Sequence, residues 1–188
     1  LGSIDVDGSN WYDGPYYVTI LNREGRVVWY RAVASDRACM YAQPAWDDSH
    51  VLYDESTTYS FSGGSPLLHR VTLDLRQDDD VAFSGFQYSF DQFDDGTIIR
   101  DSYGSNGYAL VTQTLDGEVE EVWRCRDWSG GSGGYGCYTN TVKWSPARDS
   151  VMWSLVSYNT VLEIDLSRGE VVHQWGEYRG SEDVLPAS

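Results

Sequence analysis

Lysine is almost absent from this sequence. Of its 188 residues, 13 are Lys or Arg, with Lys143 the only lysine, against 29 Asp or Glu, so the formal net charge is −16. Because nucleic-acid recognition depends on clustered surface cations, this balance predicts no nucleic-acid partner. Such acidity is typical of a solubilising or salt-adapted surface, and it also suits a surface that attracts cations.

Long hydrophobic runs are missing as well. No stretch approaches the roughly 18 consecutive apolar residues of a membrane span, so we expect no membrane-spanning segment. The sequence shows no signal peptide, which a mature or trimmed chain would have lost. Hydrophobic residues nevertheless make up 41% of the chain and aromatic residues 14%, which is enough to fill a sizeable core.

Metal-binding patterns are also lacking. There is neither a Cys-x-x-Cys motif nor a Cys/His cluster of zinc spacing, so a structural zinc is not expected. Asp5, Asp7 and Ser9 alternate as in a calcium loop, but Gly8 falls at the fourth place instead of the sixth and no bidentate glutamate follows. We therefore predict no metal ion and no cofactor.

Cysteine occurs three times. Cys125 and Cys137 bracket the 11-residue segment "RDWSGGSGGYG", which we expect to form a Gly-rich loop, and a disulfide between them would stabilise the fold by about 3 kcal/mol. The alternative is a pair of reduced, inert thiols. We predict the disulfide, with Cys39 either a buried small residue or paired outside this chain. Because disulfides persist in oxidising compartments, the protein is predicted to be exported, to the periplasm or the extracellular space.

A β-hairpin phrase, in contrast, recurs along the chain. In "NTVLEIDLSRGEVVHQWGE" (159–177) two stretches rich in β-branched and aromatic residues flank a polar turn that ends in Gly169. Similar phrases occupy 16–33 and 109–125, with turn glycines Gly25 and Gly117. A weaker copy at 69–86 has an aspartate run in place of the glycine, and we expect that run to form a solvated hairpin tip.

A second phrase alternates with the first. Residues 45–56, 90–102 and 142–157 each place an aromatic residue before an acidic turn and a strand after it. Together the two phrases give four strands per unit and a period of roughly 40 to 50 residues, which is typical of β-propeller blades. No segment carries apolar residues at helical spacing, so the predicted fold is all-β, with four-stranded antiparallel blades.

The blade count predicts an incomplete ring. Residues 16–33 supply the end of one blade, and further blades cover about 38–86, 87–124 and 137–177 within a single partial propeller domain of residues 1–188. Propellers close with roughly four to eight blades, and each blade needs both neighbours to bury its faces. We therefore expect the remaining blades to come from a longer protein or from another chain.

Residues 137–177, "CYTNTVKWSPARDSVMWSLVSYNTVLEIDLSRGEVVHQWGE", resemble the signature blade of the bacterial arylsulfotransferase propellers. "FDQFDDGTIIRDS" (90–102) is similar to an earlier blade start of that family. The resemblance extends over about 16–180. It implies a six-bladed, periplasmic or exported enzyme that moves a sulfuryl group between phenols through a sulfated histidine, with further histidines and an arginine around a central channel.

The positions that the resemblance assigns to catalysis are substituted in this chain. The histidines of the two blade starts fall on Tyr88 and Tyr138, and the arginine of the later strand falls on Val156. The accompanying residues Asn140, Val142, Ser154 and Asn159 are retained. Sulfuryl transfer needs fixed cations and hydrogen-bond donors around the transferred group, so we predict no catalytic residue here.

The three histidines present do not replace the missing ones. His69 and His173 fall on later strands of their blades, and His50 lies in a turn beside two aspartates. The first strand of each blade lines a propeller's channel, so these side chains are expected to be surface or structural histidines.

Three tyrosines share a phase at the start of the predicted first strands: Tyr41, Tyr88 and Tyr138. With Asn140 and Asn159 they are candidates for a rim at the channel mouth that binds a small aromatic or sugar ligand through ring faces and hydroxyls. The alternative is ordinary aromatic packing within the blades.

The sequence therefore predicts an exported, arylsulfotransferase-like propeller with a non-catalytic binding or structural role. The alternative function is a PAPS-independent aryl sulfotransferase that moves sulfate between phenols, with its catalytic residues on blades outside this chain.

Overall fold

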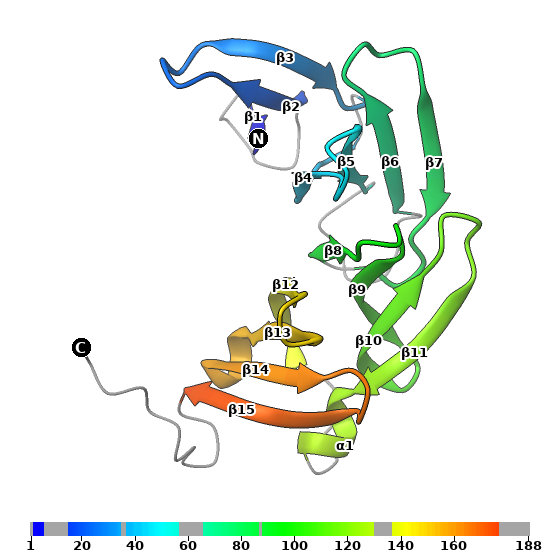
Figure 1. The fold of residues 1–188 in the computed structure, drawn as a ribbon, viewed down its shortest axis with the longest axis vertical. Helices are drawn as coiled ribbons and strands as arrows, with labels where there is room; N and C mark the ends of the chain where they lie inside the picture. Colours follow the sequence, from blue (N-terminus) through cyan, green and yellow to red (C-terminus); the bar gives the residue numbers. More distant parts are fainter. Residues whose placement is uncertain are drawn as a thin grey trace. The chain divides into compact units, whose positions relative to one another are not determined.

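The computed structural model describes residues 2–5, 15–34, 37–56, 66–86, 88–129 and 137–176. These residues form two compact units, Leu1–Ser84 and Gly85–Ser188. Figure 1 labels their helices and strands.

The first unit holds two antiparallel sheets whose strands pair in chain order. The three-stranded sheet consists of β1 (Gly2–Asp5), β2 (Tyr16–Leu21) and β3 (Val27–Ala32). The four-stranded sheet consists of β4 (Ala42–Pro44), β5 (His50–Glu55), β6 (Leu67–Thr72) and β7 (Asp78–Ala82).

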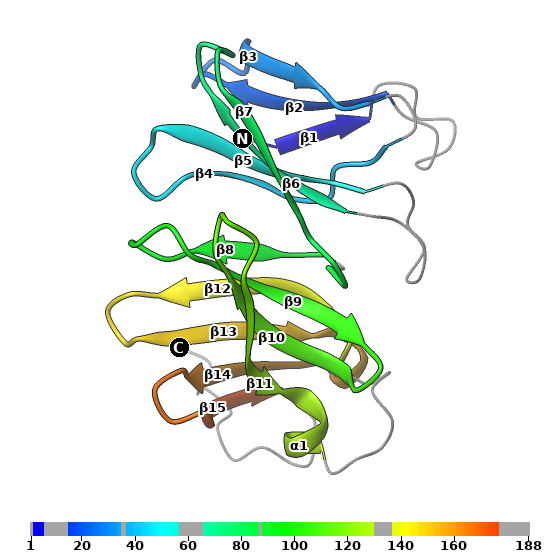
Figure 2. The same cartoon turned by 90° about the vertical axis from the view of Figure 1, so that its right-hand side faces the viewer.

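The second unit holds two four-stranded antiparallel sheets of the same topology. One consists of β8 (Phe90–Gln92), β9 (Ile98–Gly104), β10 (Gly107–Gln113) and β11 (Val119–Arg124). The other consists of β12 (Thr139–Ser145), β13 (Ser150–Leu155), β14 (Thr160–Asp165) and β15 (Glu170–Gly176). Figure 2 shows β8 beside β12, so the first strands of the two sheets are neighbours.

The predicted all-β fold of four-stranded antiparallel units is confirmed. Three sheets are complete and a fourth has three strands. The helical elements among the described residues are the five-residue helix α1 (Cys125–Ser129) and the 3-10 turn η2 (Val156–Tyr158). A loop was expected where α1 forms, and residues 130–136 of that segment lie outside the described residues. Within the described part of the chain, no helix has the length and apolarity needed to cross a membrane.

Turn glycines explain three of the hairpins. Gly25, Gly117 and Gly169 have φ angles of 76°, 91° and 66°, the left-handed region that glycine enters without steric cost. The hairpin at 69–86 differs from the prediction. Its turn, between β6 and β7, comes before the aspartate run and includes Leu75 at φ 60°. The aspartate run therefore forms the start of β7, with Asp78, Asp79 and Asp80 exposed. Exposed charges on an outer strand also discourage unwanted pairing with another sheet.

Each unit has its own core between its two sheets. In the first, Val18 of β2, Val51 of β5 and Val71 of β6 belong to one buried cluster, and Trp29 packs against it. In the second, the buried rings of Trp123 and Trp153 meet edge to face, with centroids 5.5 Å apart. Burying side chains of this size contributes roughly 1.5–3 kcal/mol each, so face-to-face stacking of the sheets stabilises both units.

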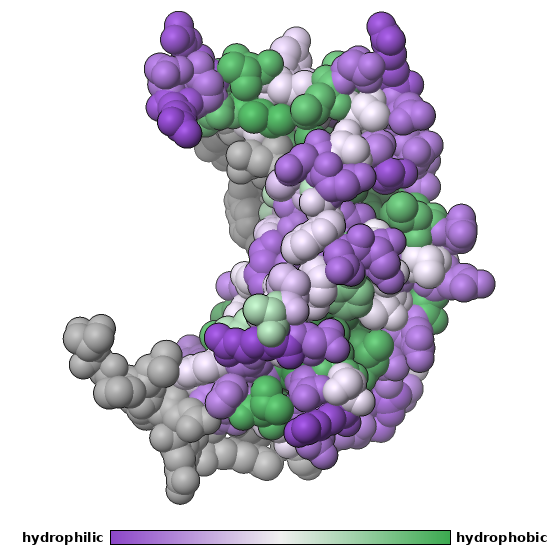
Figure 3. All heavy atoms as spheres, in the orientation of Figure 1, coloured by the Kyte–Doolittle hydropathy of each residue, from purple (hydrophilic) through white to green (hydrophobic). Residues whose placement is uncertain are grey.

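The opposite face of the β2–β3 hairpin is apolar and uncovered by the described residues. Val28 and Tyr30 alternate with Trp29 along β3 and are 61% and 60% exposed, and Leu21 at the end of β2 is 47% exposed. Figure 3 shows a hydrophobic patch over this hairpin. A sheet that is apolar on both faces is typical of one that packs between two other sheets.

Candidate ligand-binding site

Two of the predicted site residues meet in the second unit. The hydroxyl groups of Tyr88 and Tyr138 contact each other, and their rings lie edge to face with centroids 4.9 Å apart. Tyr88 is buried and Tyr138 is half-buried. Tyr88 precedes β8 and Tyr138 precedes β12, so their shared phase in the sequence places them just before two neighbouring strands. We call these two residues the tyrosine pair.

Polar side chains on β8 and in the segment before it fix that strand against β12. The Ser89 hydroxyl oxygen accepts a hydrogen bond from the backbone N–H of Val142 at 3.0 Å. The Asp91 carboxylate accepts one from the N–H of Trp144 at 2.9 Å. These side-chain bonds join the two strands that the tyrosines directly precede, so they help to set the spacing of the pair.

The backbone around Tyr88 is held by a buried carboxylate. Oδ1 of Asp101, in β9, accepts hydrogen bonds from the N–H groups of Tyr88 and Ser89 at 3.3 and 3.2 Å. Asp101 is fully buried. Its Oδ2 has no hydrogen-bond partner among the residues that the structure describes. Burial raises the pKa of the Asp101 carboxyl group to about 7, because a low-dielectric environment disfavours the charged form.

Arg100, beside Asp101 in β9, is also buried. Its Nε donates to the Gln113 side-chain oxygen at 2.8 Å, and its Nη1 donates to the Asp101 carbonyl oxygen at 3.1 Å. Burial lowers the pKa of the guanidinium to about 10, which leaves it charged at neutral pH. The described hydrogen bonds of this cation go to β9 and β10.

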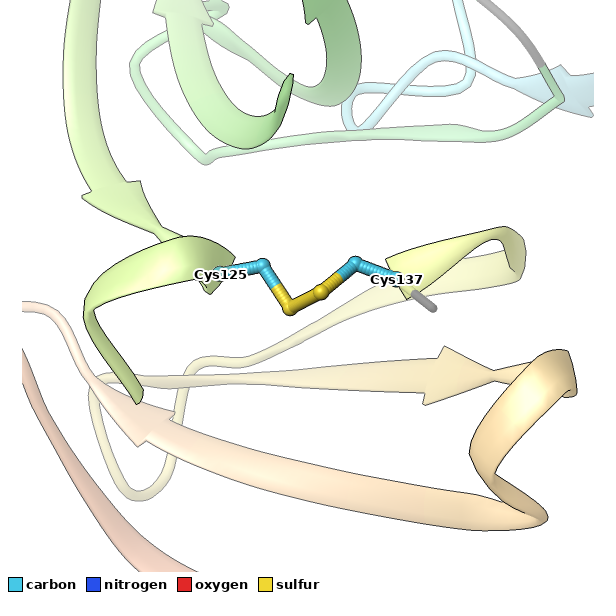
Figure 4. The surroundings of a disulfide bond; sticks show 2 residues. All are labelled: Cys125 and Cys137. Carbon is cyan, nitrogen blue, oxygen red and sulfur yellow. A yellow bond between two sulfur atoms is a disulfide. The ribbon is translucent and has the colours of Figure 1, made fainter. Parts of the chain in front are cut away.

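Tyr138 is held by a covalent bond at its neighbour. Cys137 forms the predicted disulfide with Cys125, the first residue of α1, and their Cα atoms are 6.2 Å apart (Figure 4). The Tyr138 carbonyl oxygen accepts a hydrogen bond from the N–H of Val156 at 2.8 Å. Cys39 is buried and in no disulfide, and burial raises the pKa of its thiol.

Two further tyrosines extend the aromatic cluster, and they were not anticipated from the sequence. The Tyr108 ring, in β10, lies edge-on to Tyr138 with centroids 6.3 Å apart. The Tyr103 ring, in β9, lies 4.7 Å from that of Tyr108. In the β9–β10 hairpin "YGSNGY", Tyr103 near the end of β9 pairs with Tyr108 near the start of β10. The two tyrosines that flank this turn in the sequence could have indicated the contact.

The other positions assigned by resemblance lie in backbone features. Asn140 is exposed where the β12–β13 register shifts between Thr139 and Thr141. Asn159 is exposed, follows η2 with φ 47°, and donates its N–H to the Val156 carbonyl oxygen at 3.1 Å. Because asparagine tolerates the left-handed region better than most residues, the turn explains Asn159. Val156 itself is 42% exposed.

Tyr41, the third predicted rim residue, belongs to the first unit. It directly precedes β4, and its backbone N–H donates to the carboxylate of Asp54 in β5. The same Asp54 oxygen accepts the N–H of Met40 at 2.9 Å. The arrangement repeats that of Asp101 and Tyr88. This repetition was missed, although Asp54 in "VLYDES" and Asp101 in "IIRDSY" occupy the same place.

The histidines take part in local contacts. His69 stacks on Tyr53 with ring centroids 4.7 Å apart, and its two ring nitrogens lie 3.5 Å from oxygens of Glu55 and Asp78. His50 was expected in a turn, but it is the buried first residue of β5, and its Nδ1 contacts the Ser49 hydroxyl. The exposed His173 lies beside Trp175 with centroids 5.6 Å apart. The contacts given for these three histidines do not include Tyr88 or Tyr138.

The calcium-like pattern cannot be followed in the structure, since Asp7 and Ser9 lie outside the described residues. Among the side chains that are described, no group of three or more His, Cys, Asp or Glu residues is placed to hold a metal ion.

Comparison with known proteins supports the fold. No family model and no curated protein matches the sequence. A crystal structure of a Bacteroides caccae protein of unknown function is similar over 95% of this chain, with a TM-score of 0.58 and 16% identity. Virginiamycin B lyase from Staphylococcus aureus is similar over 94%, with a TM-score of 0.54 and 13% identity. The chain spans 59% of the length of each of these structures, and its fold is that of part of a β-propeller.

Proposed function

We propose that this chain is part of an exported β-propeller that binds a small neutral aromatic or sugar ligand at the tyrosine pair, without catalysing a reaction. The observation that carries the proposal is the contact of the Tyr88 and Tyr138 hydroxyls at the start of two neighbouring first strands. Phenolic hydroxyls both donate and accept hydrogen bonds, and the rings offer apolar faces. Half-buried Tyr138 leaves part of this surface accessible to a ligand.

The surrounding charges favour a neutral ligand. The Asp91 carboxylate lies on β8, beside β12, and the whole chain carries a net charge of −16. The described cations nearby are already engaged: Lys143 lies 3.6 Å from the Asp91 carboxylate, and Arg100 donates to β9 and β10. An anionic ligand would therefore be repelled from this region.

The resemblance to the arylsulfotransferase propellers supports a related scaffold with its chemistry removed. The family's histidine and arginine positions hold Tyr88, Tyr138 and Val156. Tyrosine, with an unperturbed pKa near 10, is a poor general base at neutral pH, and the valine side chain has no donor. Loss of a single donor costs about 10²–10³ in rate, so several losses together should leave negligible sulfuryl transfer.

Completion of the ring and export belong to the same proposal. The chain spans 59% of the length of the similar structures. The apolar face formed by Leu21, Val28 and Tyr30 fits the face of a further blade, supplied by the same polypeptide or by another chain. The Cys125–Cys137 disulfide supports folding in an oxidising compartment, either the periplasm or the extracellular space.

The test measures phenol binding to the complete protein by isothermal titration calorimetry and ligand-observed NMR. Removing one hydroxyl hydrogen bond costs about 1 kcal/mol, so Tyr138→Phe should weaken phenol binding about fivefold. Tyr158→Phe is the matched control, because Tyr158 is half-buried in the same unit and its ring lies against Trp128; this variant should bind as the unchanged protein does. Equal affinities of Tyr138→Phe and the unchanged protein would refute the site.

A second assay decides between binding and transfer. With p-nitrophenyl sulfate as donor and phenol as acceptor, we expect no phenol-dependent release of p-nitrophenol. Robust release that depends on the acceptor and survives Tyr138→Phe would overturn the non-catalytic proposal and restore the sulfotransferase alternative.

A further inference from the structure

The tyrosine pair rests on a buried acid that the sequence did not single out. Asp101 lies in β9, 13 residues after Tyr88, and a single oxygen of its carboxylate holds the N–H groups of both Tyr88 and Ser89. Ser89 in turn accepts the N–H of Val142 in β12, the strand that Tyr138 precedes. Two hydrogen-bonded steps therefore lead from the Asp101 carboxylate to the strand of the second tyrosine.

We propose that Asp101 is a proton-linked positioning residue of the tyrosine pair: the gain or loss of a proton at its carboxyl group changes how Tyr88 is held against Tyr138. The proposal relies on the proposed function only in treating the pair as the ligand site. Asp101 acts through the backbone of Tyr88 and Ser89, not by touching a ligand.

The geometry says where the proton resides. Oδ1 already accepts two N–H groups, whereas Oδ2 is buried and has no hydrogen-bond partner among the described residues. Protonation at Oδ2 therefore leaves both backbone bonds in place but converts their acceptor from a charged to a neutral group. Hydrogen bonds to an ionised acceptor are roughly twice as strong as neutral ones, so the proton loosens the hold on Tyr88.

The two bonds at Asp101 are already long, at 3.3 and 3.2 Å. The corresponding bond in the first unit, from the Tyr41 N–H to the Asp54 carboxylate, is shorter, at 2.5 Å. A long bond is weakened further by loss of charge and offers little resistance to movement. The segment that carries Tyr88 is thus held weakly enough to respond to one proton.

The surroundings favour a change of protonation near neutral pH. Burial raises the pKa of Asp101 to about 7, while the Arg100 charge beside it acts in the opposite direction. Arg100 stays charged over this range, since its pKa is about 10. Elsewhere around the carboxyl group, Tyr88 and Ser89 come from the segment before β8, and Leu110 pairs with Asp101 from β10; of these three only Tyr88 is titratable.

The experiment follows the protein by NMR from about pH 5 to pH 9, a range centred on the neutral region. Amide signals of Tyr88 and Ser89 are recorded together with the ring signals of isotope-labelled tyrosine, assigned through Tyr88→Phe and Tyr138→Phe. We expect one titration step near pH 7, common to both amides and to the Tyr138 ring. Asp101→Asn, which keeps an oxygen acceptor but never ionises, should abolish the step.

The chain supplies a matched control. Asp54→Asn makes the same substitution in the same structural role, but in the first unit, and it should leave the step at the tyrosine pair unchanged. Persistence of the step in Asp101→Asn would overturn the proposal. So would amide signals of Tyr88 and Ser89 that do not titrate in the unchanged protein, or that titrate without the Tyr138 ring. These readouts need no ligand, so they remain decisive even if phenol does not bind.

Discussion

The Cys125–Cys137 disulfide should provide a large part of the stability of the second unit. The bond joins residues 12 apart in the sequence, and the loop-closure entropy removed from the unfolded chain corresponds to about 3 kcal/mol. Both cysteines are fully buried, so replacing them with alanine also removes packed sulfur atoms. Cys39→Ala removes one buried sulfur that forms no disulfide and therefore measures that packing loss separately.

We expect the double variant Cys125→Ala/Cys137→Ala to lose about 3 kcal/mol of unfolding free energy beyond twice the loss caused by Cys39→Ala. For a chain of this size the cross-link alone then corresponds to a fall of about 6–12 °C in melting temperature. Urea denaturation followed by tryptophan fluorescence reports the transition, because Trp123 and Trp153 contact each other in the core of the same unit.

Two outcomes would refute this reasoning. Counting thiols on the denatured, unreduced protein should give one free thiol, from Cys39, and a count of three would mean that the cross-link does not form. If the double variant loses no more unfolding free energy than twice the loss caused by Cys39→Ala, the bond contributes no stability. Reduction of the unchanged protein should lower its stability by the same cross-link contribution.

Two further predictions concern the same unit. A Cβ at Gly85 (φ 76°) would lie 2.7 Å from the Ser102 hydroxyl oxygen and 2.8 Å from the Tyr103 carbonyl oxygen. Gly117 also has a positive φ, but a Cβ there would meet nothing within 4 Å, so Gly85→Ala should lose about 1–3 kcal/mol more unfolding free energy than Gly117→Ala. Equal urea midpoints of the two variants would contradict this. The pKa of Asp101 is raised from 3.8 to about 7, so its contribution to unfolding free energy is full below pH 3.8 and falls by roughly 4 kcal/mol as the pH rises through 7. Asp101→Asn should flatten that part of the stability–pH curve, and a variant curve parallel to that of the unchanged protein would exclude this assignment.

Much of the fold could be predicted because hairpins are encoded locally. Alternating apolar residues around a turn glycine, as at Gly117 and Gly169, specify both strands and the turn between them. The prediction was wrong for the aspartate run before Ala82, which forms part of β7 instead of a turn. Composition suggested a solvated tip there, but exposed acidic residues fit an outer strand equally well, because one face of that strand meets solvent.

The candidate site was predictable only in part. Tyr88 and Tyr138 were predicted as site residues because they occupy matching positions at the start of successive blades, and the structure places them in contact. The role of Asp101 was not predicted, because its targets are backbone N–H groups 12 and 13 residues earlier, which carry no residue-specific signal. Asn159 was proposed as a site residue from the resemblance, but its left-handed backbone conformation already explains why asparagine occurs there.

A comparison of the three complete sheets explains why the two tyrosines are held differently. In the first two, an aspartate at the fourth position of the sequences "VLYDES" and "IIRDSY" holds the backbone before the first strand. The third sheet has Ser154 at that position, and its hydroxyl has no hydrogen-bond partner among the described residues. There the disulfide at Cys137 lies directly beside Tyr138 and supplies the anchor that the carboxylate supplies to Tyr88. The pair thus combines one tyrosine whose backbone is held by a buried carboxylate and one that directly follows a disulfide-bonded cysteine, so pH and reductant should act on opposite sides of the same contact.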